Sequence, residues 1–258
     1  MGRYTRVAYG ICAVALACVP VLACSQGVPV WQRLLRWGGG PSSETPVDTM
    51  MMGEHMQMSV RREARSDDSA RADAIVESAR RVLERYADVT KAEAAGYRAF
   101  APRGVIGEEV HYTNMWVARR ERKTLDLERP GSILYVRTAT GMKAVGVMYT
   151  ADVSATTEEL EARAPLGVAE WHRHVRICGW PNGTAQADYD GPGARFGFAG
   201  SISTESACDA AGGYWIPVAF GWMTHVYPNE ADPANVWLGH SMQPQPSGAM
   251  HDGHHDHR

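Results

Sequence analysis

The chain has 258 residues, of which 45% are hydrophobic and 21% are charged, a composition typical of one globular domain with room for extended ends. Its formal charge at pH 7 is −3, which argues against a basic protein that binds nucleic acid. The unusual counts are ten histidines and twelve methionines, and many of them gather in short runs.

The first residues have the layout of an export signal. Arg3 and Arg6 precede an almost wholly apolar run over residues 7–19, which is too short for a transmembrane span. The segment Val21-Leu22-Ala23-Cys24-Ser25 that follows resembles the lipobox of bacterial lipoproteins, although Leu22 stands where a small residue is more usual.

This resemblance covers only the short segment around Cys24. It implies that residues 1–23 are removed as a signal peptide and that the Cys24 thiol carries a diacylglycerol. Ser25 after the cysteine implies an outer-membrane lipoprotein that faces the periplasm or the cell surface, with the membrane as a partner through the lipid anchor. Processing at Cys18 and a plain cleaved signal peptide are the alternatives.

Residues 24–65 contain no convincing core element and include the linker-like run 38–43, so we expect a flexible, lipid-anchored stalk. Within it lies a Met/His run over residues 50–58. Thioether sulfur suits Cu(I), and imidazole suits both copper and zinc. The candidate metal ligands of this run are Met52, His55, Met56 and Met58. A disordered tether with accidental methionines is the alternative.

The globular part is expected over residues 66–242, beginning with helices. Apolar residues spaced three and four apart between positions 75 and 86 predict an amphipathic helix. Thr90 with Glu93 predicts a capping box for a second, shorter helix. Thr156 with Glu159 is expected to cap another helix, and Thr204 to begin one more.

Strands are expected at four places in the same domain. The runs at 108–117 and 215–227 are extended or apolar, and those at 133–136 and 144–149 form a hairpin through a turn at 138–141. The whole pattern predicts an α+β fold, with N-terminal helices packed on a small antiparallel sheet and flexible tails at both ends.

The stretch from 171 to 181 is the densest in reactive side chains, and two geometries compete for it. As a strand it would place His172 and His174 on one face about 6.5–7 Å apart, where they could chelate one ion. As a helix it would turn them to different sides, and Gly179 followed by Pro181 is a helix-stop signal. The helix-forming residues of 168–178 favour the helix, with an apolar stripe of Val168, Trp171, Val175 and Cys178.

Two of the five cysteines are left for pairing after export and lipidation. Cys12 and Cys18 would leave with the signal peptide and Cys24 would be lipidated, so Cys178 and Cys208 form an even pair in an oxidising compartment. A disulfide between them is expected. A metal thiolate at Cys178 and two free buried thiols are the alternatives.

Histidines of the globular part are the remaining candidate metal ligands. On a strand over 108–117, His111 would share a face with Glu109. A helix at 168–178 would leave one of its two histidines to meet His225 or His111 through the fold. The candidates are His111, His172, His174 and His225. The alternative is a structural role, in which these imidazoles hydrogen-bond to the backbone and the tryptophans pack in the core.

The last residues, 243–258, are expected to form a disordered tail rich in imidazole, which binds Zn(II), Cu(II) or Ni(II) well. Its candidate ligands are His251, His254, His255 and His257.

No Gly-x-Ser-x-Gly elbow, His-Glu-x-x-His motif or phosphate loop occurs, so catalytic residues stay undefined and a non-enzyme is favoured. The sequence predicts a cell-envelope lipoprotein that binds or buffers a transition metal, copper ahead of zinc. The alternatives are a secreted metalloenzyme with a histidine-built site and a metal-free ligand-binding or scaffold domain. In general style the core resembles uncharacterised secreted bacterial proteins, which implies no activity.

Overall fold

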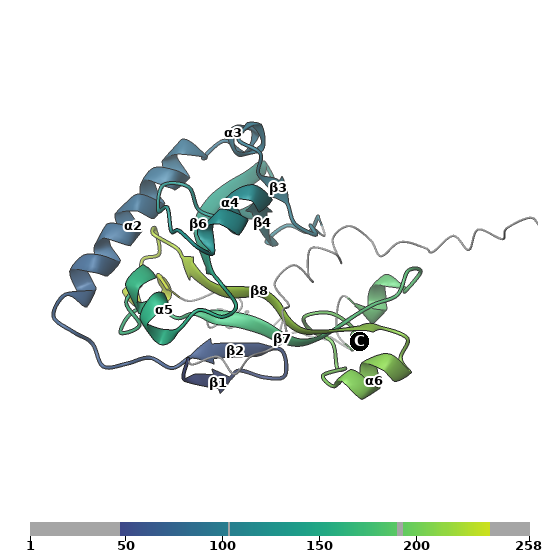
Figure 1. Cartoon of the computed structure of the whole chain (residues 1–258). Helices are drawn as coiled ribbons and strands as arrows, with labels where there is room; N and C mark the ends of the chain where they lie inside the picture. The colour runs from purple at the N-terminus through teal and green to yellow at the C-terminus, as the bar shows by residue number, and fades with distance from the viewer. Residues whose placement is uncertain (1–46, 103, 190–192, 238–258) are drawn as a thin grey trace, which may run out of the picture.

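The computed structural model describes residues 47–102, 104–189 and 193–237 (Figure 1). The lipobox-like segment with Cys24 lies outside the described residues, and so does the tail with His251, His254, His255 and His257. Within the described part of the chain, no helix is long and apolar enough to cross a bilayer.

An antiparallel sheet of eight strands forms the centre of the described fold, in the order β1-β2-β7-β8-β6-β5-β4-β3. The mixed α+β class expected from the sequence is confirmed, although the sheet is larger than expected. The strands are β1 (Thr49–Met51), β2 (Met56–Ser59), β3 (Arg98–Ala99), β4 (Glu109–Thr113), β5 (Ser132–Thr138), β6 (Gly141–Ala151), β7 (His172–Gly179) and β8 (Tyr214–Val226).

The helices begin at local capping signals. The expected capping box of α5 is confirmed, because the Thr156 hydroxyl accepts from the Glu159 amide and the Glu159 carboxylate accepts from the Thr156 amide. The expected box at Thr90 is wrong, since Asp88 caps that helix by accepting from the Thr90 amide at 2.9 Å. The helices are α2 (Asp68–Arg85), α3 (Val89–Ala94), α4 (Met115–Glu121), α5 (Thr157–Arg163) and α6 (Glu205–Ala210), with 3-10 turns at Gln186–Asp188 and Pro233–Asn235.

The two faces of the sheet carry different sets of buried side chains. One face carries the main apolar core, in which Trp171, Trp222 and Tyr149 of the sheet belong to the same cluster as Ile75 and Val82 of α2. Figure 1 shows α2 lying along this side of the molecule. The opposite face carries a smaller apolar cluster of Leu134, Met148, Met223 and Tyr227. His111, His172, His174 and His225 lie on this second face.

Residues 172–179 form strand β7, so the helix expected over 168–178 is wrong. β7 lies between β2 and β8 and pairs with both. Helix propensity is a weak local preference, and two long-range ladders override it. Gly179 serves the packing of the sheet, because a Cβ there would lie 2.0 Å from the Tyr214 ring.

Residues 49–59 form a hairpin at one edge of the sheet, with β2 paired to β7. His55 is 7% exposed and Met58 is 4% exposed. The expectation that the Met/His run lies in a flexible stalk is therefore wrong, and the folded domain begins before residue 66. Thioether side chains are apolar, so alternate methionines of a strand bury readily on one face.

The expected disulfide is confirmed. Cys178 at the end of β7 is bonded to Cys208 in α6, with their Cα atoms 5.5 Å apart. This pairing excludes a metal thiolate at Cys178 and a pair of free thiols. Around the disulfide, Phe196 is buried and Trp180 stacks on Tyr189 with ring centroids 4.3 Å apart.

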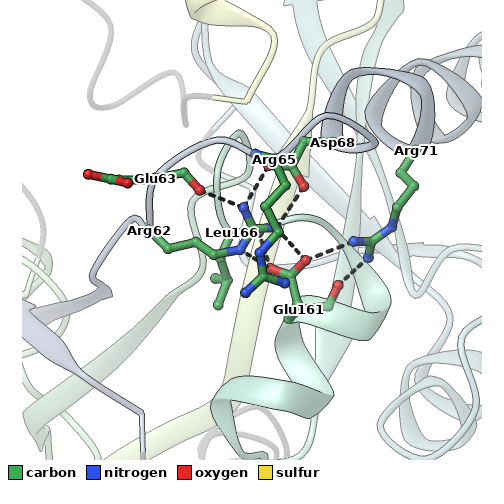
Figure 2. A network of polar contacts seen from close by, with 7 residues as sticks. All are labelled: Arg62, Glu63, Arg65, Asp68, Arg71, Glu161 and Leu166. Carbon is green, nitrogen blue, oxygen red and sulfur yellow. Dashed lines mark hydrogen bonds and ion pairs between the residues drawn. The ribbon is translucent and has the colours of Figure 1, made fainter.

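An ion-pair network joins the segment after β2 to helices α2 and α5 (Figure 2). The Arg62 guanidinium donates to both carboxylate oxygens of Asp68 at 2.6 Å and through Nε to Glu161 at 3.0 Å. Arg71 donates to the same Glu161 at 2.7 Å. Hydrogen bonds from Arg62, chiefly, lower the pKa of the Asp68 carboxyl well below its usual range.

We expect Arg62→Ala to lower the midpoint of thermal unfolding by roughly 5 °C at pH 7. A carboxyl with a depressed folded pKa contributes stability above its unfolded pKa of about 4, and this contribution is lost as the pH falls further. The gap between Arg62→Ala and wild type should therefore narrow below about pH 4, as measured by calorimetry. Arg81→Ala, which removes an exposed pair with Glu128, is the matched control and should change the midpoint far less.

Candidate functional site

Four histidine side chains meet on the second face of the sheet, although they come from three strands. His225 of β8 is in the middle, with its ring centroid 4.9 Å from that of His172 and 5.3 Å from that of His111. His172 and His174 of β7 lie 5.7 Å apart. We call these four residues, His111, His172, His174 and His225, the histidine cluster.

The register of the strands puts methionines beside this cluster. Residues directly opposite in an antiparallel pair share a face, and Met58 of β2 faces His172 while Met56 faces His174. The intervening pair confirms this alternation, because Arg173 Nε donates to Gln57 Oε1 at 2.7 Å and the Arg173 guanidinium lies over the Trp222 ring of the main core.

Two further methionines belong to the same face. Met223 of β8 is opposite His172, and Met148 of β6 is opposite His225. Both are less than a tenth exposed. The cluster is thus flanked by four thioethers from β2, β6 and β8.

The backbone is irregular beside the cluster. The pairing of β7 with β8 shifts register between His172 and His174. On β8 the residues that take up this shift are Phe220 and Gly221, with φ of 67° and 96°. Ala101 has φ of 44°, and a positive φ in a residue with a Cβ is strained. Both Ala101 and Phe220 line the cavity described below, and such strain is often found at functional sites.

Burial keeps the imidazoles of β7 neutral at physiological pH. Desolvation, with smaller repulsions from His174 and His111, lowers the pKa of His172 to about 3. Desolvation likewise lowers the pKa of His174 to about 4. A neutral imidazole carries one N–H donor and one nitrogen with a lone pair, which is the form that binds a metal.

Two of the rings have polar groups of the protein beside them. The backbone of His55 raises the pKa of His174, against the larger effect of burial. His111 Nε2 lies 3.4 Å from Glu109 Oε1, and the Tyr227 hydroxyl donates to the same carboxylate at 3.0 and 3.1 Å. Partners of this kind, backbone carbonyls and carboxylates, are those that hold metal-binding histidines in position.

A cavity of about 330 Å³ opens against the cluster. His111 and His174 line it, together with Met223 of the flanking methionines. Its other wall residues are Phe100, Ala101, Glu108, Glu109, Thr113, Met115, Ala118, Arg119, Arg122, Thr150, Phe198 and Phe220.

The structure brings together most of the candidate ligands. His111, His172, His174 and His225 meet as described, and Met56 and Met58 lie opposite the β7 histidines. Met52 is half exposed on the hairpin and is not paired with a cluster residue. His55 binds backbone, since its Nε2 donates to the Gly200 carbonyl at 2.6 Å.

Sequence reasoning missed Met148, Met223, Phe198 and Phe220. The two methionines could have been found from period two alone, since Met223 lies two positions before His225 on a predicted strand. Nothing local pointed to the phenylalanines, because Phe198 lies in a loop and Phe220 lies at the register shift of β8.

Among residues 47–102, 104–189 and 193–237, no three His, Cys, Asp or Glu side chains are arranged so that they could hold one metal ion as they stand. The cluster is therefore a set of imidazoles in ring contact and not a preformed three-ligand site.

Comparison with models of protein families, with curated proteins and with solved structures found no match to this chain.

Proposed function

We propose that this protein is a cell-envelope lipoprotein that binds or buffers a transition metal, copper ahead of zinc, through the histidine cluster and its flanking methionines. The observation that supports the proposal is the contact of four imidazoles from β4, β7 and β8 on one face. The lipid anchor at Cys24 and metal capture by the tail histidines are part of the proposal on sequence grounds alone.

The spacing of the rings suits a shared ion. A metal about 2.0–2.1 Å from a nitrogen of each of two imidazoles places the two ring centroids about 5 Å apart. The three centroid distances in the cluster are 4.9, 5.3 and 5.7 Å. Rotation about the soft Cβ–Cγ torsion would turn the nitrogens toward one point without moving the strands.

The choice of copper follows from the methionines. Thioether sulfur is a soft ligand that suits Cu(I), whereas zinc prefers thiolate, imidazole and carboxylate. Imidazole and thioether ligands are uncharged, so a monovalent ion is less costly to bury among them than a divalent ion. His172, opposite both Met58 and Met223, is the most favourable centre for such a site.

A substitution of one sulfur tests the proposal. Met58→Leu keeps the volume and apolarity of a buried side chain but removes its ligand, so we expect about tenfold weaker Cu(I) binding with Zn(II) binding unchanged. Met142→Leu is the matched control, because Met142 is a partly buried strand methionine that packs against the main core on the other face. Binding is measured by competition with a Cu(I) chelator, in a full chain whose four tail histidines are changed to alanine in every variant.

His172→Asn in the same assay should abolish tight Cu(I) binding. Wild-type protein that takes up no Cu(I) would refute the proposal and leave the metal-free alternative. Equal Cu(I) affinity in Met58→Leu and wild type would refute the part assigned to sulfur.

A second candidate function, a metalloenzyme, is favoured by the chain from Tyr227 through Glu109 to His111. Its last member lines the cavity, so a metal held at the cluster would have one side facing a space large enough for a substrate. An enzyme keeps an open coordination position, whereas a storage site is closed. If the protein is a metalloenzyme, azide should change the spectrum of the Cu(II)-loaded protein. If the site only stores metal, azide should leave the spectrum unchanged.

A further inference from the structure

The cavity beside the histidine cluster has the walls of a ligand pocket. Phe100, Phe198 and Phe220 reach it from three separate parts of the chain. The Phe100 and Phe220 rings meet edge to face with centroids 5.7 Å apart, and Phe198 lies nearly parallel to Phe220 at 6.2 Å. Phe198 also touches the His174 ring at 4.8 Å. Aromatic side chains gathered in this way favour a flat, apolar ligand.

One side of α4, extended by its C-cap residue Arg122, forms another part of the wall. Met115, Ala118, Arg119 and Arg122 all line the cavity, and their spacing of three and four residues places them on one face of the helix. Trp116, on another side of the same helix, is 76% exposed and does not line the cavity. The helix therefore presents two guanidinium groups beside the aromatic wall.

The two carboxylates of the cavity already face donors of the protein. Glu108 Oε2 accepts from the amides of Gly104 and Val105 at 2.8 and 3.2 Å. Glu109 accepts from the Tyr227 hydroxyl and lies beside His111. Burial lowers the pKa of Arg122, Asp152 raises it, and the neighbouring Arg119 lowers it. An anion close to both guanidinium groups would offset their mutual repulsion.

We propose that this cavity binds a small aromatic anion, a carboxylate or phenolate, with its ring against Phe198 and Phe220 and its charged oxygen toward Arg119 and Arg122. A volume of about 330 Å³ suits a compound with one ring. The inference goes beyond metal binding and does not depend on it, because the aromatic wall and the arginines belong to the protein itself.

The inference is tested by titrating benzoate into the full-length protein in a calorimeter, with a metal chelator present. Benzoate should bind saturably with a dissociation constant below about 1 mM. Benzylamine has a similar ring and the opposite charge, and acetate has the charge without the ring. We expect both to bind at least about tenfold more weakly.

Variants locate the site. Phe198→Ala, at a position 36% exposed, should weaken benzoate about tenfold. Arg119→Gln should remove most of the preference for benzoate over benzylamine. Trp116→Ala is the matched control and should bind benzoate like wild type, and near-ultraviolet circular dichroism checks that each variant is folded.

Equal binding of benzoate and benzylamine, unchanged affinity in Phe198→Ala, or no saturable benzoate binding would overturn the inference. Since the titration contains no free metal, its failure is independent of the copper proposal. Benzoate binding by a protein that takes up no Cu(I) would support the cavity assignment while refuting the metal site.

Discussion

Removing the disulfide between Cys178 and Cys208 should lower the free energy of unfolding by about 3–4 kcal/mol. The bond closes a loop with a sequence separation of 30 residues, and the chain-entropy model assigns that much to the restriction of the unfolded chain. The change is Cys178→Ser together with Cys208→Ser, measured by urea unfolding under oxidising conditions.

The effect should reach the candidate site. The closed loop carries Phe198, which contacts His174 and lines the cavity, and Gly200, whose carbonyl accepts from His55. We therefore expect the double variant to bind benzoate more weakly than wild type, in addition to being less stable.

Reductant provides the control for this prediction. It should lower the stability of wild type by a similar amount and leave the double variant unchanged. A loss below about 1 kcal/mol would contradict the prediction and would mean that the unfolded chain already holds this loop together.

Truncating Glu121 should cost about 3–5 kcal/mol of folding free energy. The side chain is 2% exposed and accepts three hydrogen bonds, from the amide and hydroxyl of Thr150 at 2.9 and 2.8 Å and from the Gly131 amide at 3.1 Å. Glu121→Ala leaves the two buried amides without their acceptor, leaves the Thr150 hydroxyl with only the Ala118 carbonyl at 3.4 Å, and opens a cavity behind α4. Urea unfolding measures the loss, and the exposed Glu84→Ala on α2 is the control.

Glu121 should also make the free energy of unfolding depend on pH. Burial raises the pKa of its carboxyl to about 8, against the pull of its donors and of Arg163 in the opposite direction. A raised folded pKa gives a contribution that is complete below the unfolded value, about 4.3, and is lost as the pH rises through the folded value. Glu121→Gln cannot ionise, so its stability should improve relative to wild type between about pH 4.5 and pH 8. A constant difference over this range would contradict the assignment.

Glu121 also links stability to the site. It ties the end of α4 to β6 through Thr150, and α4 and its C-cap residue supply Arg119 and Arg122 of the cavity. The hydrogen bonds of this buried carboxyl thus fix the position of α4, which lines the proposed ligand pocket.

Features with a local physical cause were predictable from the sequence. The β5–β6 hairpin has its turn at positions 138–141, α5 has its capping box at Thr156 and Glu159, and strand β8 is a long apolar run. The disulfide followed from the parity of cysteines left after export. Each of these depends on neighbours in the sequence or on counting, and not on distant pairing.

Strand β7 is the main feature for which the sequence predicted the wrong secondary structure. The surrounding range 168–178 contains helix formers and an apolar stripe at helical spacing, yet β2 and β8 pair with β7 from both sides. The Met/His run was misassigned for the same reason, because its place at the sheet edge depends on β7.

The sequence by itself determined the chemistry available to this protein: imidazoles, thioethers, one disulfide and an α+β pattern. Only the tertiary structure decided that His111, His172, His174 and His225 share one face, with Met58 and Met223 opposite His172. The physical reason is that strand register is a long-range property. A shift of one residue would turn each of these side chains to the other face of the sheet, and the pairing of distant strands fixes that register.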